Sequence, residues 1–269
     1  MERSRLKNII LLILVLVNAM MLIALASTRI QESNARKRLT SQLVAMFENN
    51  GIVLNAEKIP AELPPTGTVL HRNTNEERTM AVLFLGKSPE TDNAGGGIYT
   101  YSTSRGNATF RTDGSFEITG RLGSSHIEKL CRKFCSVYGY KNLKLTLRNG
   151  KGQGKATQYY KNGKCIVNCT VSFLIEGDSL VSVSGTHIPN PDSRFNGKTV
   201  SMTAATALTR FLEFHRQSGT VVSKIKRIFP CYRLKSSVSA PMSLVPIWRI
   251  VTDTGNYDVN CTTGTVTQA

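Results

Sequence analysis

Histidine and acidic residues are both scarce in this sequence. Only 18 aspartates and glutamates stand against 34 lysines and arginines, and there are four histidines. The histidines are His71, His126, His187 and His215. They are scattered among predicted loops and helix surfaces, with no carboxylate or cysteine placed to complete a triad. We therefore expect no catalytic residues, no cofactor, no metal site and no small-molecule substrate, which means that we expect no enzyme.

Several short motifs typical of enzymes lack the partners that their chemistry needs. Gly177-Asp178-Ser179-Leu180 resembles an esterase motif without a downstream Asp-x-x-His, and Asp253-Thr254-Gly255 has no second copy with which to share a proton. Both favour turns instead. Ser223-x-x-Lys226 falls on a predicted strand, and the glycine-rich Asp92–Gly97 lacks the lysine of a phosphate loop. A hydrolase that uses Ser179 or Asp253 is the weakest alternative.

The shortage of acids leaves a formal net charge of +16. In a cytosolic protein this charge would favour nucleic acid, but an exported domain meets anionic lipid headgroups or acidic cell-wall polymers instead. Such a charge also keeps a domain soluble without any specific partner. A hydrophobic content of 41% with 19% charged residues argues against wholesale disorder. We expect no nucleic-acid partner.

The most prominent feature is the apolar run Ile9–Ala26, interrupted only by Asn18. As a helix it spans roughly 27 Å, close to the ~30 Å of a hydrocarbon core. The preceding cations are Arg3, Arg5 and Lys7, which favour a cytoplasmic N-terminus. Ala24-Leu25-Ala26 fits a signal-peptide cleavage pattern, but the run exceeds the about 7–15 residues of such a core. We predict an uncleaved single-pass anchor in the cell membrane, with the C-terminal domain extracellular.

An amide in the middle of a span is stabilised by hydrogen bonds across a helix interface, worth about 0.6–2 kcal/mol. Helical spacing places the candidate partner-binding residues on one face, and they are Leu14, Asn18, Met21 and Leu25. A polar residue tolerated in a simple tether is the alternative.

Beyond the anchor, the patterns predict an α+β fold, with two helix-plus-antiparallel-sheet units of related design. The expected segments are a cytoplasmic tail at 1–8, a transmembrane helix at 9–27, a juxtamembrane helix and linker at 28–65, a first α+β unit at 66–190 and a second at 191–269.

Each unit is predicted to contain a helix with one apolar face. The first follows the capping box Ser125-His-Ile-Glu128, and its apolar face consists of Ile127, Leu130, Cys131, Phe134 and Cys135. The same spacing recurs 77 residues later, from 127 to 204, at Ala204, Ala207, Leu208, Phe211 and Leu212. Antiparallel strands joined by turns at Asn162-Gly163 and Asp253–Asn256 follow these helices. Another helix is expected over Ile30–Asn50, and a β-rich stretch is expected to begin at Thr79–Leu85.

Six cysteines occur, and the sequence leaves their state open. Cys131-x3-Cys135 lies on a predicted helix and Cys165-x3-Cys169 on a predicted strand, all on apolar faces. Four residues cover about 6 Å on a helix but about 13 Å on a strand, so two bridges between them would strain each other. Buried thiols, one bridge or a zinc site are the options. Cys231 and Cys261 are candidates for a pair in the second unit.

Three stretches resemble the YycI/YycH regulatory proteins of Gram-positive bacteria. Ser4–Ile10 runs into an apolar span with Asn18, and Leu43–Leu54 with Ile59-Pro60 resembles the juxtamembrane segment of that family. Pro246–Ile250, Gly255–Asn260 and Gly264–Val266 are similar to its closing hairpin, which also resembles the PepSY-type pattern.

The resemblance implies a single-pass accessory protein that binds a WalK-like sensor histidine kinase and a sister YycH-like regulator. Such a protein tunes two-component signalling for cell-wall metabolism. A different class of function is a basic envelope module of PepSY type that binds an anionic polymer or inhibits a protease.

Overall fold

The computed structural model describes residues 2–87, 89–123, 126–189, 202–237 and 240–269. Its helices are α1 (Glu2–Glu48), the 3-10 helix η1 (Ala56–Lys58), α2 (Thr74–Leu85), α3 (Ile127–Val137) and α4 (Ala204–Ser218). Its strands are β1 (Thr68–Leu70), β2 (Glu90–Asn93), β3 (Tyr99–Thr103), β4 (Gly106–Phe110), β5 (Ser115–Gly123), β6 (Tyr140–Arg148), β7 (Lys151–Tyr159), β8 (Cys165–Glu176), β9 (Ser179–Thr186), β10 (Ile225–Ser237), β11 (Ala240–Thr252), β12 (Asn256–Asn260) and β13 (Val266–Gln268).

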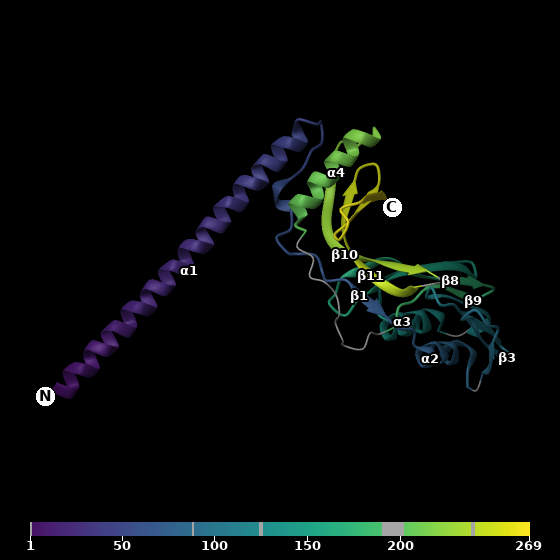
Figure 1. The fold of residues 1–269 in the computed structure, drawn as a ribbon. Coiled ribbons are helices and arrows are strands. Elements are labelled where there is room, and N and C mark those ends of the chain that lie inside the picture. The colour runs from purple at the N-terminus through teal and green to yellow at the C-terminus, as the bar shows by residue number, and fades with distance from the viewer. Residues whose placement is uncertain (1, 88, 124–125, 190–201, 238–239) are drawn as a thin grey trace.

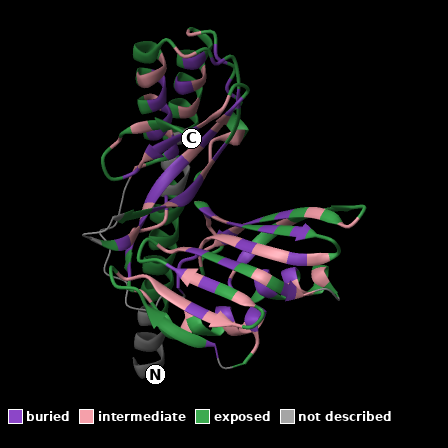
Figure 2. Cartoon of the chain, turned by 90° about the vertical axis from the view of Figure 1, so that its right-hand side faces the viewer, coloured by how far each residue is buried: buried purple, intermediate pink, exposed green. Residues whose placement is uncertain are grey.

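The expected α+β class is confirmed: helices cover a large, mostly antiparallel sheet that divides into two parts. The first part has the strand order β6-β7-β8-β9-β5-β4-β3-β2, and α2 and α3 pack on one of its faces. Figure 2 shows how buried and exposed positions alternate along these strands. Phe134 of α3 is fully buried among Phe84, Phe116 and Phe173, which centres the core under this helix.

The second part consists of β10, β11, β12 and β13, with β1 added at the far end of β11. Its core lies between these strands and two helices, α4 and the C-terminal end of α1 (Figure 1). All five residues of the predicted apolar face on α4 are buried. Phe47 of α1 stacks on Phe211 of α4 with ring centroids 6.4 Å apart.

A narrow junction joins the two parts of the sheet. β8 and β10 run parallel there, with Ile166 opposite Tyr232. A small core that includes both residues fills the space beneath. Asn168 of β8 accepts a hydrogen bond from the backbone N–H of Leu234 and donates one to its carbonyl oxygen, both at 2.8 Å. The side-chain amide of Asn168 therefore takes the place of further ladder hydrogen bonds between the two strands.

The helix expected after Ser125 is present as α3, with Cys131, Phe134 and Cys135 buried. Ser125 itself lies outside the described residues. The residue before the helix is His126, which has a positive φ of 57° and makes no capping hydrogen bond with its side chain. Glu128, the expected partner in the capping box, instead pairs with Arg132 one turn later.

The β-rich expectation was wrong at Thr79–Leu85, because this segment forms the second half of α2. The Asn73 side chain accepts a hydrogen bond from the N–H of Glu76 and so caps the helix. Gly86, at a φ of 91°, ends it. The buried residues Met80, Ala81, Phe84 and Leu85 recur at helical spacing, so the short apolar run has the period of a helix and not that of a strand.

α1 extends far from the folded body, and its N-terminal end lies at the opposite extreme of the molecule (Figure 1). In the part of the chain that the structure describes, no helix combines the length and the apolarity that a membrane crossing requires. The transmembrane part of the expected fold therefore stays a prediction.

Candidate functional site

A buried carboxylate between two guanidinium groups lies in the second part of the sheet, on the face opposite α4. Asp258 of β12 stands directly opposite Arg249 of β11 in the antiparallel register. Arg249 donates from Nε to Oδ1 at 2.7 Å and from Nη2 to Oδ2 at 2.9 Å. Arg233 of β10 donates from Nη2 to the same Oδ2. Strand alternation explains the placement, since Tyr257 and Val259 point into the core on either side of Asp258.

These charges are largely withdrawn from water. The side chain of Asp258 is 2% exposed, that of Arg249 16% and that of Arg233 38%. Burial opposes the charge of Arg249, but hydrogen bonding to Asp258 and its charge outweigh burial and raise the pKa of Arg249. The Nε of Arg233 is buried without a hydrogen-bond partner among the described residues. The cluster is thus a fixed, net-positive group of donors.

A groove of about 500 Å³ adjoins this cluster. Its lining includes Arg233 and Lys235, together with hydroxyl and amide groups from the last two strands and the loop between them. Those groups belong to Asn260, Thr265, Thr267 and Gln268. Such a surface can donate hydrogen bonds to a carboxylate or to a peptide carbonyl, and Asp258, the only acid in the lining, is held by both arginines.

Two thiols lie beside the same cluster. Cys165, at the start of β8, is partly exposed, and Cys231, in β10, is fully buried. The Cys231 S–H donates to the sulfur of Cys165, and together with the Arg249 guanidinium this lowers the pKa of Cys165 to about 7. The same hydrogen bond and burial raise the pKa of Cys231. The expected pair of Cys231 with Cys261 is not formed, because β10 brings Cys231 to β8 instead.

The remaining cysteines are buried and free. Burial raises the pKa of Cys131 to about 12, that of Cys135 to about 11 and that of Cys261 to about 12, and it also raises the pKa of Cys169. Of the options left open by the sequence, the structure has free thiols, which are buried except for the partly exposed Cys165. No group of three or more histidine, cysteine or acidic side chains that could hold a metal occurs within the described ranges.

One histidine has a carboxylate partner that the sequence did not reveal. His187 is buried in the first part of the fold, and its Nε2 lies 3.1 Å from Oε1 of Glu76 in α2. The Nδ1 of His187 lies 3.0 Å from the side-chain nitrogen of Gln158, which also donates to the backbone oxygens of Tyr138 and Ile188. Both ring nitrogens are thus engaged, so His187 is not poised as a free general base.

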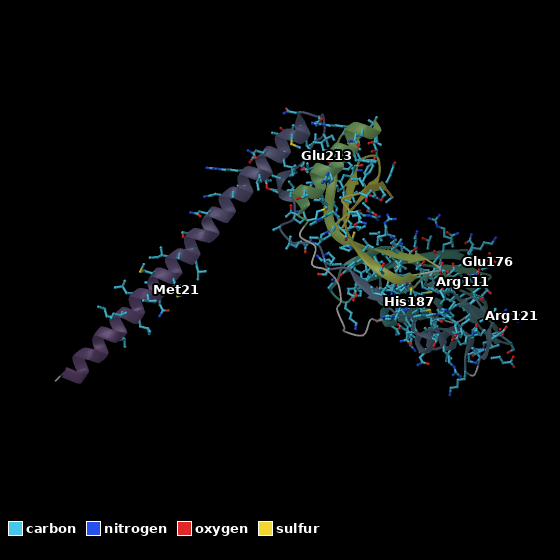
Figure 3. The ribbon with its side chains drawn as sticks, in the orientation of Figure 1. Met21, Arg111, Arg121, Glu176, His187 and Glu213 are labelled. Atoms are coloured by element: carbon cyan, nitrogen blue, oxygen red, sulfur yellow. The ribbon has the colours of Figure 1, made fainter. Side chains whose placement is uncertain are left out.

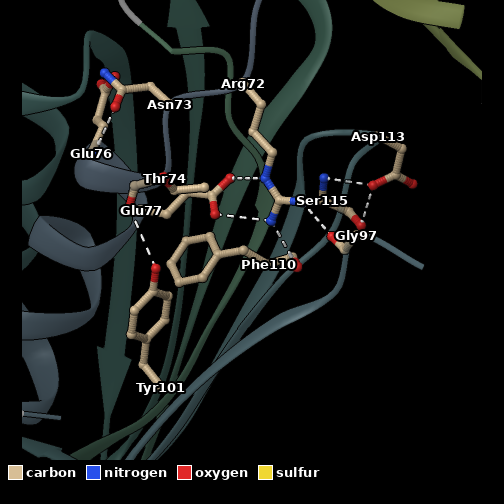
Figure 4. Close-up of polar contacts among 10 residues, drawn as sticks. All are labelled: Arg72, Asn73, Thr74, Glu76, Glu77, Gly97, Tyr101, Phe110, Asp113 and Ser115. Atoms are coloured by element: carbon tan, nitrogen blue, oxygen red, sulfur yellow. Dashed lines mark hydrogen bonds and ion pairs between the residues drawn. The ribbon is translucent and has the colours of Figure 1, made fainter. Parts of the chain in front are cut away.

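The glycine-rich loop before β3 is fixed by Arg72, as Figure 4 shows. Arg72 forms a bidentate pair with Glu77, at 2.6 and 2.9 Å, and donates to the backbone oxygens of Phe110 and Gly97. Gly97 has a φ of 76°, and a Cβ there would lie 2.2 Å from the Thr112 side chain. The loop is therefore a packed structural turn. Its first two residues, Asp92 and Asn93, belong to the strand β2.

The other motif residues also lie in turns. Gly177-Asp178 connects β8 to β9, with Asp178 at a φ of 58°. Asp253 accepts hydrogen bonds from the hydroxyl and N–H of Ser223 and from the N–H of Lys224. The Ser223 hydroxyl is the main cause that lowers the pKa of Asp253 to about 2. Both motifs therefore have the turn role that their residues favour.

The predicted partner-binding residues lie together on α1, away from the Asp258 cluster and from His187. Leu14, Met21 and Leu25 are 61–64% exposed, and Asn18 is also exposed. Figure 3 shows Met21 on the projecting helix, far from His187 in the folded body. Their role in binding a partner stays a prediction.

No family model matches this chain, and no curated protein matches it. Solved structures do match. An uncharacterized protein from Eubacterium rectale ATCC 33656 is 8% identical, with a TM-score of 0.45 over 76% of this chain and 80% of that one. The Bacillus megaterium YpeB C-terminal domain is 10% identical, with a TM-score of 0.38 over 74% and 98%. YycH from Bacillus subtilis is 10% identical, with a TM-score of 0.37 over 78% of this chain and 53% of that one. At this distance the chain is similar to these proteins in parts of its fold alone.

Proposed function

We propose that this chain is a membrane-attached, non-enzymatic regulator that binds a sensor histidine kinase, together with a sister regulator, and tunes two-component signalling for cell-wall metabolism. The single observation that carries the proposal is the continuity of α1. One uninterrupted helix carries an exposed apolar segment at its N-terminal end and is buried at its C-terminal end in the core of the second part of the fold.

The apolar segment of α1 has a surface that water does not stabilise. The large apolar side chains between Leu11 and Leu25 are 51–68% exposed, and they surround the helix on all sides. Exposed apolar area costs about 25 cal/mol per Å² relative to burial, so a helix of this kind is stabilised by lipid or by apolar helices of a partner. A membrane anchor with the folded body outside the cell satisfies this requirement.

The other end of α1 is fixed to the folded body. Leu43 and Phe47 are buried, and Phe47 stacks on Phe211 of α4. Arg216 at the end of α4 donates to the side chain of Asn50 just beyond α1, at 2.9 Å. If a partner helix moves α1, the second part of the fold therefore moves with it. A tenfold shift between two kinase states requires only about 1.4 kcal/mol of differential binding.

The first experiment asks where the chain resides. We expect the full chain to stay in the membrane fraction after alkaline carbonate extraction, with its body digested by protease added outside the cell. A chain that begins at residue 28 should appear in the soluble fraction. A full chain released by carbonate, or protected from the external protease, would falsify the membrane part of the proposal.

The second experiment asks which face of α1 meets the kinase. A photo-crosslinking residue at Met21 reports the predicted face, and the same residue at Ile23 reports the opposite face at equal exposure. We expect kinase cross-links from Met21 to exceed those from Ile23 severalfold. Asn18→Leu should weaken co-purification and change kinase output, whereas Leu16→Ala should not. Equal cross-linking from both faces, or an unaffected Asn18→Leu variant, refutes the proposed contact.

A second candidate function is favoured by four cations on β6 and β7, on the face of the first part of the sheet that no helix covers. Lys144 stands opposite Lys155, and Arg148 stands opposite Lys151, in the register of β6 and β7. All four are exposed, and within the described residues none of them forms an ion pair. Like charges placed opposite each other repel, and a bound polyanion relieves this. This arrangement fits an envelope module that binds an anionic polymer.

Salt distinguishes this candidate. We expect binding to an anionic polymer such as teichoic acid to weaken at least tenfold from low to high ionic strength. Lys144→Glu with Lys155→Glu should abolish binding, whereas Lys129→Glu with Lys133→Glu on α3 changes the net charge equally and should reduce it much less. Equal losses in the two double variants would show only a non-specific charge effect and would remove this function.

A further inference from the structure

We propose that Cys165 and Cys231 form a reversible disulfide that joins the two parts of the sheet. This modification site is independent of the kinase-binding proposal, because it involves neither α1 nor a partner protein. It follows from the strand register at the junction and from the different exposure of the two thiols.

The register places the two cysteines within disulfide distance. β8 and β10 are parallel, and Ile166 stands opposite Tyr232. The residues immediately before them, Cys165 and Cys231, are therefore lateral neighbours on the same face of the sheet. Adjacent strands lie about 4.8 Å apart, which is within the Cα separation of about 4.4–6.8 Å that a disulfide spans. Cys231 is also the main cause that lowers the pKa of Cys165, in agreement with the neighbouring positions that the register gives the two residues.

The two thiols differ in the way that a thiol–disulfide exchange needs. Cys165 is partly exposed at the beginning of β8, whereas Cys231 has no exposed surface. The Cys231 S–H and the Arg249 guanidinium stabilise a thiolate on Cys165, so Cys165 is the attacking sulfur. Cys231 is buried away from external reagents and lies beside Cys165 on the adjacent strand, so we assign it to the second step, the attack on the mixed disulfide.

The reaction is a two-electron oxidation by a disulfide donor, either a small disulfide or the oxidised dithiol of a thiol oxidoreductase. The Cys165 thiolate attacks one donor sulfur, so the donor S–S bond breaks, a mixed disulfide forms, and one donor thiolate leaves. Cys231 then loses its proton to water and attacks the Cys165 sulfur. The new bond between the two cysteines displaces the second donor thiolate. Two thiols of the protein are oxidised while one donor disulfide is reduced to two thiols.

The other four cysteines do not compete for this reaction. Cys131, Cys135, Cys169 and Cys261 are all buried, and burial raises the pKa of each thiol. They remain protonated near neutral pH and are inaccessible to the donor. Oxidation is therefore selective for the pair at the junction.

The bond has a mechanical consequence because the junction is narrow. Cys165 and Cys231 are 66 residues apart in the chain, and the described ladder between β8 and β10 consists of one parallel pair. A covalent link there prevents the two parts of the sheet from separating. The oxidised chain should unfold at a temperature roughly 10 °C higher than the reduced chain.

Peptide mapping of the full chain tests the proposal directly. The purified chain is reduced, exposed to oxidised glutathione, alkylated and digested with trypsin without reductant. Trypsin releases the peptide Ile228–Arg233, in which Cys231 is the one cysteine. It also releases a peptide that begins at Cys165 and contains Cys169 as well. We expect these two peptides to be cross-linked, with the mass of two hydrogen atoms lost from the intact chain. Cys169→Ser should preserve the cross-link, which assigns it to Cys165.

Single variants test the order of attack. In Cys231→Ser the reaction should stop at a stable glutathione adduct on Cys165, whereas in Cys165→Ser the buried Cys231 should remain unmodified. Alkylation of Cys165 should have its midpoint near pH 7 in the reduced chain and at a higher pH in Cys231→Ala, because alanine has no side-chain donor, whereas serine would keep one. A cross-link from Cys231 to Cys261, or an oxidised chain without any link between the two mapped peptides, overturns the proposal. The wild-type map decides this even where a variant fails to fold.

Discussion

Replacement of Asp258 by asparagine removes the negative charge from the cluster between β10, β11 and β12 while it preserves the volume of the side chain. The carboxylate is 2% exposed and accepts two hydrogen bonds from Arg249 and one from Arg233. In the variant, two guanidinium groups face each other across a neutral amide, and the amide NH2 adds a further donor where only acceptors are needed. The variant should therefore be strongly destabilised.

The magnitude follows from the burial of the partners. Loss of one member of a buried ion pair costs about 3–5 kcal/mol, because the remaining charge is left without compensation. Arg249 is 16% exposed but Arg233 is 38% exposed, so Arg233 can turn toward water more easily than Arg249 can. We therefore expect Asp258→Asn to lower the free energy of unfolding by about 3 kcal/mol. The double variant with Arg249→Met should recover at least 1 kcal/mol of the summed single effects.

The assay is urea unfolding followed by the fluorescence of Trp248. This is the only tryptophan in the sequence, and it is fully buried in the second part of the fold, where its Nε1 donates to the Met202 carbonyl at 3.0 Å. Its signal therefore reports the unfolding of the elements that hold Asp258. A loss below about 0.5 kcal/mol for Asp258→Asn, or strict additivity in the double variant, would refute the reasoning, because it would mean that water already screens the cluster.

Three further predictions concern other parts of the chain. Phe47→Ala empties a fully buried site between α1 and α4 and should cost about 3–5 kcal/mol, whereas the more exposed Met46→Ala should cost less than about 1 kcal/mol by the same fluorescence assay. His187→Leu removes two hydrogen bonds from the buried network of the first part and should cost about 1–3 kcal/mol, measured by circular dichroism during urea unfolding. Burial raises the pKa of Tyr138 and Tyr232 to about 12, above the value near 10 of an unfolded chain. Above pH 10 these phenols ionise in the unfolded chain but not in the folded one, which favours unfolding. The free energy of unfolding should therefore be unaffected by them below pH 10 and should fall between about pH 10 and 12, as a falling unfolding temperature in an alkaline series would show.

The local pattern of the chain was enough for the elements whose cause is local. The apolar spacing on α4 predicted its five buried residues, and the Asn162-Gly163 pair predicted the turn between β7 and β8, where Gly163 has a φ of 77°. These features depend on residues within one or two turns of the chain, so a window of sequence contains the whole reason. The helix at Thr74–Leu85 also has a local cause, because its buried residues have helical spacing and the Asn73 side chain caps its first turn.

The polar sites were out of reach for a different reason. Nothing near Glu76 in the sequence indicates His187, 111 residues away, and the two meet only because α2 packs beside the end of β9. Likewise, Asp258 read in isolation is one acid in a strand, and its two arginines come from two neighbouring strands. Electrostatic partners of this kind are chosen by packing and not by chain distance.

By itself the sequence determined the long apolar segment of α1, the two amphipathic helices α3 and α4 and the turns between successive strands, because hydrophobic period and turn chemistry act over a few residues. Only the tertiary structure decided that β8 lies parallel to β10, that Cys165 therefore meets Cys231 and not one of the other four thiols, and that Arg249 and Arg233 converge on Asp258. Strand order and register set those contacts, and both depend on which hydrophobic faces must be buried together across the whole molecule.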